Sequence, residues 1–289
     1  MTLARLAPFI FVLLWSTGFV GAKFGLPYAE PFTFLLLRML IVVALLGAFA
    51  LATRAEWPSS WALAAHAGVT GVLLHAGYLG GVFFAISRGL PAGLAALIVG
   101  LQPILTAILA QLLLRERVNA VQWSGLVLGF VGVALVVGEK VLSARVAQIE
   151  PSAFVAVSLA LVCTTLGTVY QKRFGSSMPL VGGTVVQYVA ASAGLLVLAL
   201  LFGERMRIEW TPQFALAMGW LVLVLSIGAI LLLMYLIRHN SASAVASLFY
   251  LVPPATALEA YLLFGERLGA LALLGMAVAM VGVALVVRR

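Results

Sequence analysis

Polar and aromatic side chains lie at the centres of long apolar runs in this sequence, where they could contact a small molecule. His75 and Tyr78 lie about one helical turn apart, so a helix would place them on one face. Trp15 lies at the centre of the first run, and Gln102 directly precedes Pro103. Such groups are costly in an apolar medium unless they face protein or water. We therefore interpret them as candidates for binding a solute by hydrogen bonds and ring stacking.

Two further candidates come from the second half of the chain. Tyr250 lies shortly before Pro253 and Pro254, and Thr165 lies in a threonine-rich stretch of the sixth run. A simpler interpretation exists for each residue type. Threonines in apolar helices usually bond their own backbone, and aromatic residues often only pack. Both interpretations stay open at this stage.

Composition and motifs exclude several catalytic chemistries. The chain has no aspartate, which excludes aspartyl proteases and phospho-aspartate pumps. It has no GxxxxGK[ST] loop for ATP and no HExxH zinc motif, and its single cysteine, Cys163, permits no internal disulfide. An intramembrane serine hydrolase is the remaining enzyme alternative, but Ser124 in QWSG lacks the motif that such enzymes need. We expect no enzyme, no metal and no cofactor.

Membrane-spanning helices must position these residues. With 64% hydrophobic and 9% charged residues, the composition lies far outside the soluble range. The apolar runs are about 20 residues long, which is the length that crosses roughly 30 Å of hydrocarbon as a helix. We predict an all-α polytopic membrane protein with ten transmembrane helices. The ten runs are 6–26, 31–51, 61–87, 91–114, 118–137, 152–170, 180–202, 213–237, 241–264 and 270–287.

The chain repeats itself at an offset of 150 residues. The hexapeptide GVALVV occurs twice at this spacing, and 17 of 35 positions are identical between 103–137 and 253–287. Composition alone would give on the order of one match in ten. We predict two repeats, residues 1–140 and 151–289, that form one transmembrane unit. Five crossings per repeat are an odd number, so the second repeat must enter the membrane from the opposite side.

Two of these crossings carry small residues at helical spacing. The fifth run has Gly125 and Gly129, and the tenth has Gly275 and Ala279, each pair four positions apart. Small residues at this spacing let two helix backbones approach closely in lipid. We predict that both helices serve packing.

Two charged residues lie inside apolar runs. Arg38 is seven residues into the second run, and Glu259 is about five residues before the end of the ninth. At 1.5 Å per residue, each lies roughly 8–10 Å below the membrane surface. An unpaired charge at that depth is costly, so Arg38 and Glu259 could pair, directly or through water, and act as a gate. The alternative is that each side chain snorkels to the interface separately.

Three prolines are candidate hinges. Pro103, Pro253 and Pro254 have no backbone N–H, so each would leave a carbonyl four residues earlier without its helical partner. Broken helices at the interface of two repeats point to a substrate site. A packing kink is the alternative for each proline alone, whereas their symmetric placement favours a hinge or site role.

The inverted repeat indicates a transporter. Secondary transporters often have this construction, with the substrate site near the midplane where the halves meet. The centres of the first and sixth helices carry Trp15 and Thr165 and no carboxylate, which suits a neutral or zwitterionic solute with an apolar body. We predict alternating access to a midplane cavity. A passive channel or facilitator is the alternative, although channel pores usually show rings of like residues from an oligomer.

The residues also carry a resemblance to a known family. The stretch WSTGFVGAKFGLPYAEPFTFLLLR, the prolines of the fourth and ninth helices with the following Glu-Arg, and the glycine-rich fifth and tenth helices resemble the EamA branch of the drug/metabolite transporter superfamily. The resemblance covers nearly the full length. It implies ten helices, cytoplasmic termini and a cavity built mainly by helices 1, 3, 4, 6, 8 and 9. Within this branch the sequence resembles the bacterial aromatic-amino-acid exporters in particular. This resemblance implies that the protein exports amino acids, aromatic ones included.

Basic residues give an independent indication of orientation. With the N-terminus inside, nine Lys and Arg fall on the inner side and seven on the outer side. We expect a multi-pass protein of the bacterial inner membrane with both termini cytoplasmic. The expected partners are a small-molecule substrate and the lipid bilayer, and a monomer would suffice. Nucleic acid is not expected, because the 17 basic residues are scattered over almost every loop.

Overall fold

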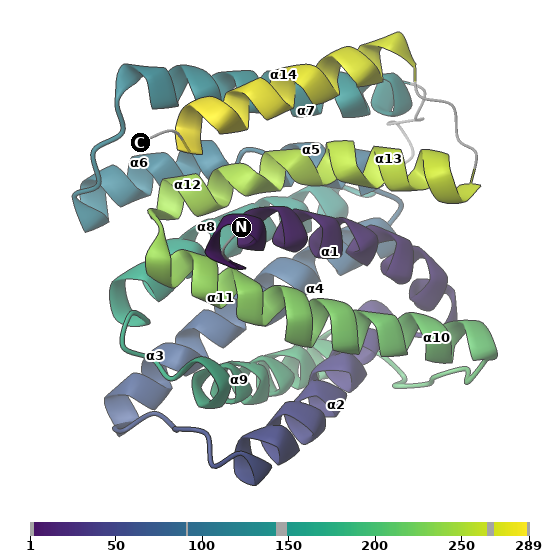
Figure 1. The fold of residues 1–289 in the computed structure, drawn as a ribbon. Helices are drawn as coiled ribbons and strands as arrows, with labels where there is room; N and C mark the ends of the chain where they lie inside the picture. Colours follow the sequence, from purple (N-terminus) through teal and green to yellow (C-terminus); the bar gives the residue numbers. More distant parts are fainter. Residues whose placement is uncertain (1–2, 91, 143–148, 265–268, 288–289) are drawn as a thin grey trace.

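The computed structural model describes residues 3–90, 92–142, 149–264 and 269–287, and nearly all of them are helical (Figure 1). Apart from one isolated bridge between Ala29 and Ile208, these residues form no β-structure. Six of the predicted crossings are single helices, namely α1 Leu3–Gly25, α2 Pro31–Ala52, α7 Ala120–Leu142, α8 Pro151–Phe174, α9 Leu180–Leu201 and α14 Ala270–Val287. The all-α prediction is confirmed.

The other four crossings consist of shorter pieces in line. The third comprises α3 Trp61–Gly71, the π-helix η2 Val72–Gly77 and α4 Tyr78–Ser87. The eighth comprises α10 Pro212–Trp220, the π-helix η4 Leu221–Ala229 and α11 Ile230–His239. The fourth comprises α5 Ala92–Val99 and α6 Gln102–Leu114, and the ninth comprises α12 Ala242–Ser247, the 3₁₀-helix η5 Leu248–Leu251 and α13 Val252–Phe264. The irregular turns therefore recur at equivalent places in the two repeats.

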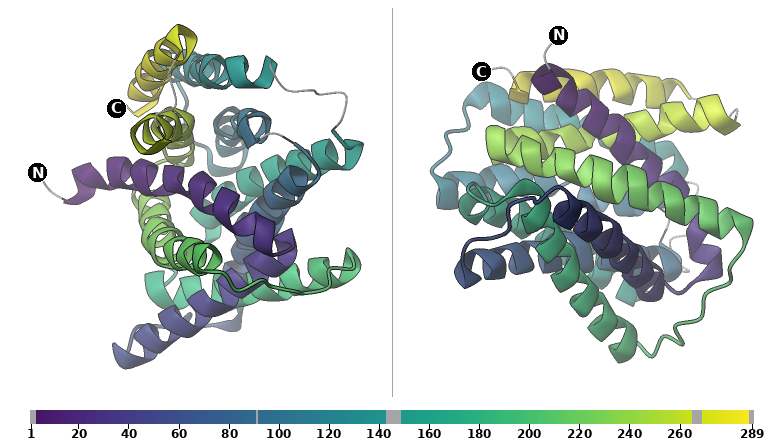
Figure 2. Two further views of the ribbon diagram at one scale, coloured as in Figure 1. Left: turned by 90° about the vertical axis from the view of Figure 1, so that its right-hand side faces the viewer. Right: turned by 60° about the horizontal axis from the view of Figure 1, so that its bottom comes forward.

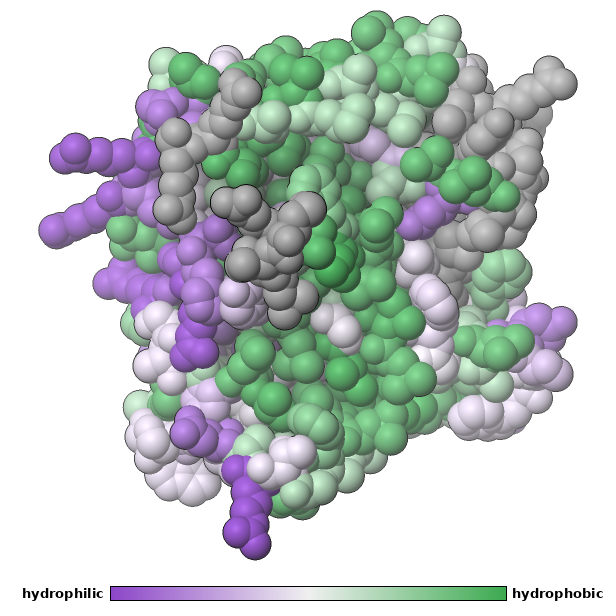
Figure 3. Space-filling view, in the orientation of Figure 1, coloured by the Kyte–Doolittle hydropathy of each residue, from purple (hydrophilic) through white to green (hydrophobic). Residues whose placement is uncertain are grey.

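Length and composition fit a membrane protein of ten crossings. Eight crossings are long and apolar enough to span a bilayer, and the first and ninth contain the shorter apolar stretches Leu6–Gly18 and Ala242–Ala255. Apolar residues form a broad band down the middle of the space-filling view, whereas hydrophilic residues gather at its left and right edges (Figure 3). The helices run from one hydrophilic edge to the other and so cross the apolar band, as expected for membrane-spanning helices (Figure 1).

The three candidate hinge prolines begin helices instead of bending continuous ones. Pro103 is the second residue of α6, which follows a break at Gly100 and Leu101. Pro253 and Pro254 lie in the first turn of α13, directly after η5. A proline is tolerated in a first turn because the N–H groups there have no helical partner in any case. The chain is thus irregular directly before each proline, which agrees with broken helices at these positions, and the hinge role stays a prediction.

The equivalent helices α7 and α14 pack against each other in opposite directions. Gly125 lies against Gly282, and Gly132, two turns further along α7, lies against Gly275. The two helices form a layer of their own at the top of Figure 1 and stay paired in both views of Figure 2. The predicted close packing of small residues is thus present as a seam between the halves.

The equivalent helices α2 and α9 are also antiparallel. The carboxylate of Glu204, just after α9, accepts a hydrogen bond from the backbone N–H of Phe32 at the start of α2, at 2.9 Å. At the other end, Gly182 near the start of α9 lies against Glu56, beyond the end of α2. Two pairs of equivalent helices in opposite directions agree with the inverted arrangement of two five-helix repeats.

The seam between α7 and α14 yields the first prediction. A methyl group at Gly132 would meet the backbone of Ala279 and Gly275, so Gly132→Ala must push the two helices apart. We expect a loss of about 1–3 kcal/mol in stability, which is typical of overpacking. The measurement is the thermal unfolding midpoint of the purified protein in detergent.

The matched control for this prediction is Gly138→Ala on the same helix. A methyl group at Gly138 has open space around it, so the variant gains helix propensity, up to about 1 kcal/mol, without a clash. Equal unfolding midpoints for the two variants would contradict a close-packed seam.

Candidate functional site

A cavity between the two halves, here called the central chamber, contains the strongest sequence candidates. It holds about 590 Å³ of empty space, including space open to solvent. The chamber is lined by Trp15 and Gly18 of α1, Arg38 of α2, His75 of η2, Tyr78, Leu79, Val82, Phe83 and Ile86 of α4, Tyr188 of α9, Leu225 of η4 and Ile230 of α11. Its wall is thus mostly apolar and aromatic, with few polar groups.

Arg38 is held in this wall by the π-helix η4. Its Nε donates a hydrogen bond to the hydroxyl of Ser226 at 2.7 Å, and its side chain is buried. The backbone carbonyl of the same serine accepts a hydrogen bond from the hydroxyl of Tyr188 at 2.6 Å. π-turns interrupt the regular hydrogen-bond ladder of a helix and often occur at functional sites. Here the turn brings one serine within reach of both α2 and α9.

His75 lies in the other π-helix, η2, and stacks on Tyr188. The two ring centroids are 4.6 Å apart with an interplanar angle of 14°. Only 1% of His75 is exposed, and its Nε2 makes no hydrogen bond of standard geometry among the described residues, although the Gln187 side chain lies close enough to interact with the ring. A buried polar atom without a partner is costly and calls for an explanation, such as a ligand or an ordered water.

Trp15 and Tyr78 line both the central chamber and an adjoining one. This side chamber of about 460 Å³ also touches Val99 and Gly100 at the break in the fourth crossing, and Pro253 in the ninth. Trp15 packs against the rings of Phe11 and Phe249 at centroid distances of 5.2 and 5.3 Å. The predicted aromatic centre is therefore present, and one side of it adjoins the two broken helices.

Three other sequence candidates lie outside the central chamber. The amide Nε2 of Gln102 donates to the hydroxyl of Thr168 on α8 at 3.2 Å. The hydroxyl of Thr165 donates to the carbonyl of Leu161 in its own helix at 2.7 Å, which is the simpler of its two interpretations. Tyr250 is fully buried with its ring against Gly129 of α7. In this conformation Gln102 and Thr165 bond within the helix bundle, and Tyr250 packs against α7 with its buried hydroxyl unpartnered among the described residues.

Arg38 and Glu259 are not brought together. Arg38 binds Ser226, whereas Glu259 Oε1 accepts a hydrogen bond from the hydroxyl of Ser16 on α1 at 2.5 Å. Over the described ranges the one ion pair is between Arg88 and Glu150. The expected direct pair is corrected, because each charge has a nearer hydroxyl partner on a neighbouring helix. Neither residue is a lone snorkelling side chain.

A vestibule at one end of the molecule lies next to the central chamber. This vestibule of about 1,220 Å³, including space open to solvent, is lined by the segment 26–31, by Ile86 and Ser87, and by Arg205, Arg207 and Glu209. Ile86 lines both the vestibule and the central chamber, so the two adjoin at this side chain. This end contains the C-terminal ends of α1 and α4, at the right of Figure 1.

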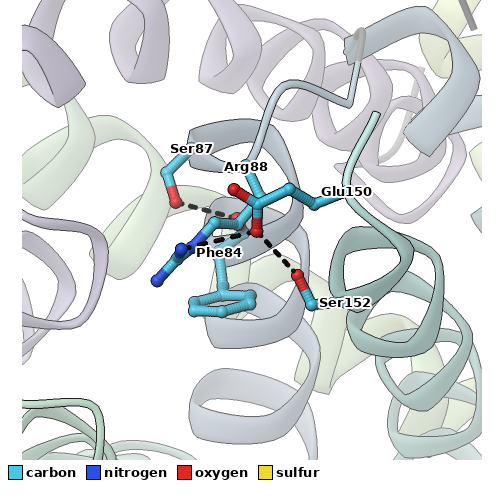
Figure 4. A network of polar contacts seen from close by, with 5 residues as sticks. All are labelled: Phe84, Ser87, Arg88, Glu150 and Ser152. Carbon is cyan, nitrogen blue, oxygen red and sulfur yellow. Dashed lines mark hydrogen bonds and ion pairs between the residues drawn. The ribbon is translucent and has the colours of Figure 1, made fainter. Parts of the chain in front are cut away.

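A polar cluster next to the vestibule joins the two halves (Figure 4). Arg88 Nη1 lies 3.4 Å from Glu150 Oε2, and the Arg88 guanidinium lies over the Phe84 ring at 5.0 Å from its centroid. The Ser152 hydroxyl donates to the same Glu150 oxygen at 3.1 Å. Because both charged side chains are about half exposed, the pair contributes at most about 1 kcal/mol.

The opposite end is closed by hydrogen bonds to backbone carbonyls. Lys172 Nζ on α8 donates to the carbonyls of Ile237 and Asn240 at 2.9 and 2.6 Å. Arg238 Nε donates to the carbonyl of Ser176 at 2.7 Å. These bonds tie the α8–α9 turn to the end of α11. A small pocket at this end, of about 240 Å³, shares no described lining residue with the central chamber.

Sequence reasoning missed Tyr188 and Ser226, and it assigned Arg38 to a gate at the outer part of the cavity and not to substrate binding. The expected cavity helices did not include the second and seventh, yet α2 and α9 supply Arg38 and Tyr188. One signal was available, since these residues occupy positions 150 apart, and so are equivalent in the repeat. No group of His, Cys, Asp and Glu that could hold a metal ion occurs among the described residues.

Comparisons with known proteins agree with this architecture. The model of the EamA-like transporter family matches the chain twice, over residues 3–138 and 151–288. Similar proteins include the "Uncharacterized inner membrane transporter YedA" of Escherichia coli K12, 27% identical over 97% of this chain and 89% of that protein. Another is the "Probable amino-acid metabolite efflux pump" of the same strain, 26% identical over 94% of this chain and 90% of that protein. The "Uncharacterized transporter YvbV" of Bacillus subtilis is 29% identical over 84% of this chain and 77% of that protein.

The fold is also that of a solved structure. A crystal structure entitled "Crystal structure of protein" superposes with a TM-score of 0.79 at 22% identity, over 97% of this chain and 94% of that one. The family model covers nearly the whole length in two copies, and the relatives named above are transporters. The chain therefore belongs to the EamA-like transporter family, within the drug/metabolite transporter superfamily.

Proposed function

We propose that this transporter exports amphipathic small metabolites, amino acids with aromatic side chains among them, by alternating exposure of the central chamber. The chamber offers aromatic faces from Trp15, Tyr78 and Tyr188 and polar groups from Arg38 and His75. Such a site suits a solute with one apolar part and one polar part. The Escherichia coli relative named "Probable amino-acid metabolite efflux pump" supports the same substrate class.

The observation that carries the proposal is the asymmetry of access to the chamber. The chamber adjoins the vestibule at Ile86, whereas the hydrogen bonds of Lys172 and Arg238 close the opposite end. A site between two halves that adjoins a vestibule at one end and is bonded shut at the other supports alternating access. The breaks before Pro103 and Pro253 are the proposed hinges, because they adjoin the side chamber.

Counterflow in proteoliposomes tests this function against the passive-channel alternative. Vesicles loaded with unlabelled phenylalanine should accumulate labelled phenylalanine transiently, because a carrier exchanges solutes across the membrane whereas a pore only equilibrates them. Leucine and glycerol serve as amphipathic and polar comparison solutes. Equilibration without transient accumulation would favour a facilitator.

Replacement of the aromatic wall should weaken substrate binding. Trp15→Ala removes a buried ring that lines both chambers, so we expect a loss of about 1–3 kcal/mol in the free energy of phenylalanine binding. Tyr78→Ala should have an effect of similar size. The measurement is the dissociation constant for labelled phenylalanine on the purified protein.

Two matched variants distinguish a substrate contact from a general effect. Trp61→Ala removes a tryptophan that is 93% exposed at the start of α3, and it should leave the dissociation constant unchanged. Gln102→Ala removes a side chain that bonds Thr168, and it should change stability more than affinity. Equal affinities for Trp15→Ala and Trp61→Ala would move the substrate site away from the chamber.

We further propose that the protein lies in the bacterial inner membrane with both termini in the cytoplasm. The Escherichia coli relative YedA is named an inner membrane transporter. Helix α1 begins and α14 ends in the left half of Figure 1, toward the closed end of the chamber. The vestibule then faces the outside, and residues 1–140 and 151–289 form the two halves of one transmembrane unit.

Labelling of single cysteines in intact cells tests this orientation. In a Cys163→Ser background, Glu209→Cys in the vestibule should react with a membrane-impermeant maleimide added from outside. Ser177→Cys in the turn between α8 and α9 is also exposed but lies at the opposite end, so it should react only after permeabilisation. The reverse pattern would invert the proposed topology.

A further inference from the structure

We propose that Arg38 binds the carboxylate of the transported solute, and that the solute's ammonium group is dispensable for recognition. This inference rests on the proposed function and narrows its substrate class. The preferred solutes would be small carboxylates with an apolar or aromatic body. Amino acids would then be recognised as acids and not as zwitterions.

The charge of Arg38 lacks a counter-charge in the chamber. The residue is 4% exposed, and the one hydrogen bond of its side chain within the described part of the chain goes to the neutral hydroxyl of Ser226. None of the described residues that line the central chamber is acidic. A buried guanidinium that is charged at every physiological pH is costly without an anion. A substrate anion would supply the missing charge while it is bound.

The contact with Ser226 uses one of the three guanidinium nitrogens of Arg38. Ser226 bonds Nε and fixes the plane of the group, and Tyr188 in turn bonds the Ser226 carbonyl. Arginine has five N–H donors in a rigid fork, so one bond at Nε leaves the two terminal nitrogens for a carboxylate. A residue held in this way loses little further conformational freedom when the anion binds.

His75 provides a second polar group beside the same cavity. Its ring is fixed by the stack on Tyr188, and its buried Nε2 makes no hydrogen bond of standard geometry among the described residues. Both Arg38 and His75 line the central chamber, with Trp15 and Phe83 among the aromatic residues of the wall. A carboxylate oxygen could accept a hydrogen bond from Nε2–H of the neutral imidazole. The apolar body of the solute would then lie against the aromatic wall.

An ammonium group would find no matching site. With no acidic side chain among the described lining residues, an ammonium could interact only with aromatic faces or neutral acceptors, and it would be repelled by Arg38. Removal of the carboxylate from a substrate should therefore weaken binding strongly, whereas removal of the ammonium should not.

The test compares matched ligands on the purified full-length protein. The aromatic set is phenylalanine, 3-phenylpropionate and phenethylamine, and the aliphatic set is leucine, 4-methylpentanoate and 3-methylbutylamine. Competition with the tightest-binding labelled member gives each dissociation constant. We expect 3-phenylpropionate to bind at least as tightly as phenylalanine, and phenethylamine to bind roughly 10- to 100-fold more weakly.

Variants of Arg38 connect this preference to the residue. Arg38→Met should reduce the affinity for the acids to that for the amine, and Arg38→Lys, which keeps the charge but loses the fork, should restore part of the preference. Arg88→Gln removes an exposed arginine outside the chamber and should keep the wild-type ranking. Melting curves show whether each variant is folded, and Arg38→Lys, which keeps the buried charge, decides the case if Arg38→Met does not fold: an unchanged acid preference in Arg38→Lys would then overturn the role of the arginine fork.

The outcomes separate this inference from the proposed function. Equal binding of phenethylamine and 3-phenylpropionate would overturn the inference while the aromatic export function stands. A preference for acids in the aliphatic set alone would support the inference and overturn the aromatic assignment. Binding of no member of either set would overturn both. A wild-type acid preference that survives in folded Arg38→Met would remove Arg38 from the carboxylate site.

Discussion

The absence of water in hydrocarbon is the constraint on which the whole structure depends. Each backbone N–H and C=O within the membrane must find a partner in the protein, so every crossing is helical. Irregular backbone is tolerated only where it is covered by protein or borders a cavity. The structure follows this rule, because η2 and η4 contribute His75 and Leu225 to the chamber wall, and the breaks in the fourth and ninth crossings border the side chamber. At Ser226 a side chain from another helix, Tyr188, supplies the partner of the carbonyl.

Close packing at two contacts between the halves frames the cavity. Glycines bring α7 and α14 into backbone contact, and the Glu204 carboxylate binds the start of α2 at the vestibule end. Neither contact relies on bulky apolar side chains. Lipid tails are as apolar as leucine, so moving such a side chain from lipid into a helix contact gains no hydrophobic free energy. Bulky aromatic residues such as Trp15 and Tyr78 line the chamber instead. There they could pack against the apolar body of a bound solute.

The repeat supplies the fold twice, whereas the chemistry of the chamber occurs once. At positions 150 apart, Arg38 corresponds to Tyr188, His75 to Leu225 and Ala76 to Ser226. Divergence of these pairs turns two equivalent π-turns into one polar cluster in which arginine, serine, tyrosine and histidine meet. An amphipathic solute has no internal symmetry of this kind, so an asymmetric site fits it better than a symmetric one. The inverted scaffold still gives each half the same packing surfaces in opposite directions.

The sequence by itself determined the number and position of the crossings, the repeat and its inversion, and the depth of each polar residue. These properties depend on local hydropathy and on the number of crossings in each repeat. Neither requires knowledge of which helices are adjacent in space. The partner of each polar side chain was decided by the tertiary structure, because it depends on helix rotation and on which helices are adjacent. Thus Arg38 could pair with Glu259 or reach the interface alone as far as the sequence shows, but in the structure it binds Ser226, and Gln102 binds Thr168. The prediction that Trp15, His75 and Tyr78 share one cavity is confirmed. Polar groups at the middle of the membrane are costly in lipid, so their helices turn them toward the protein interior.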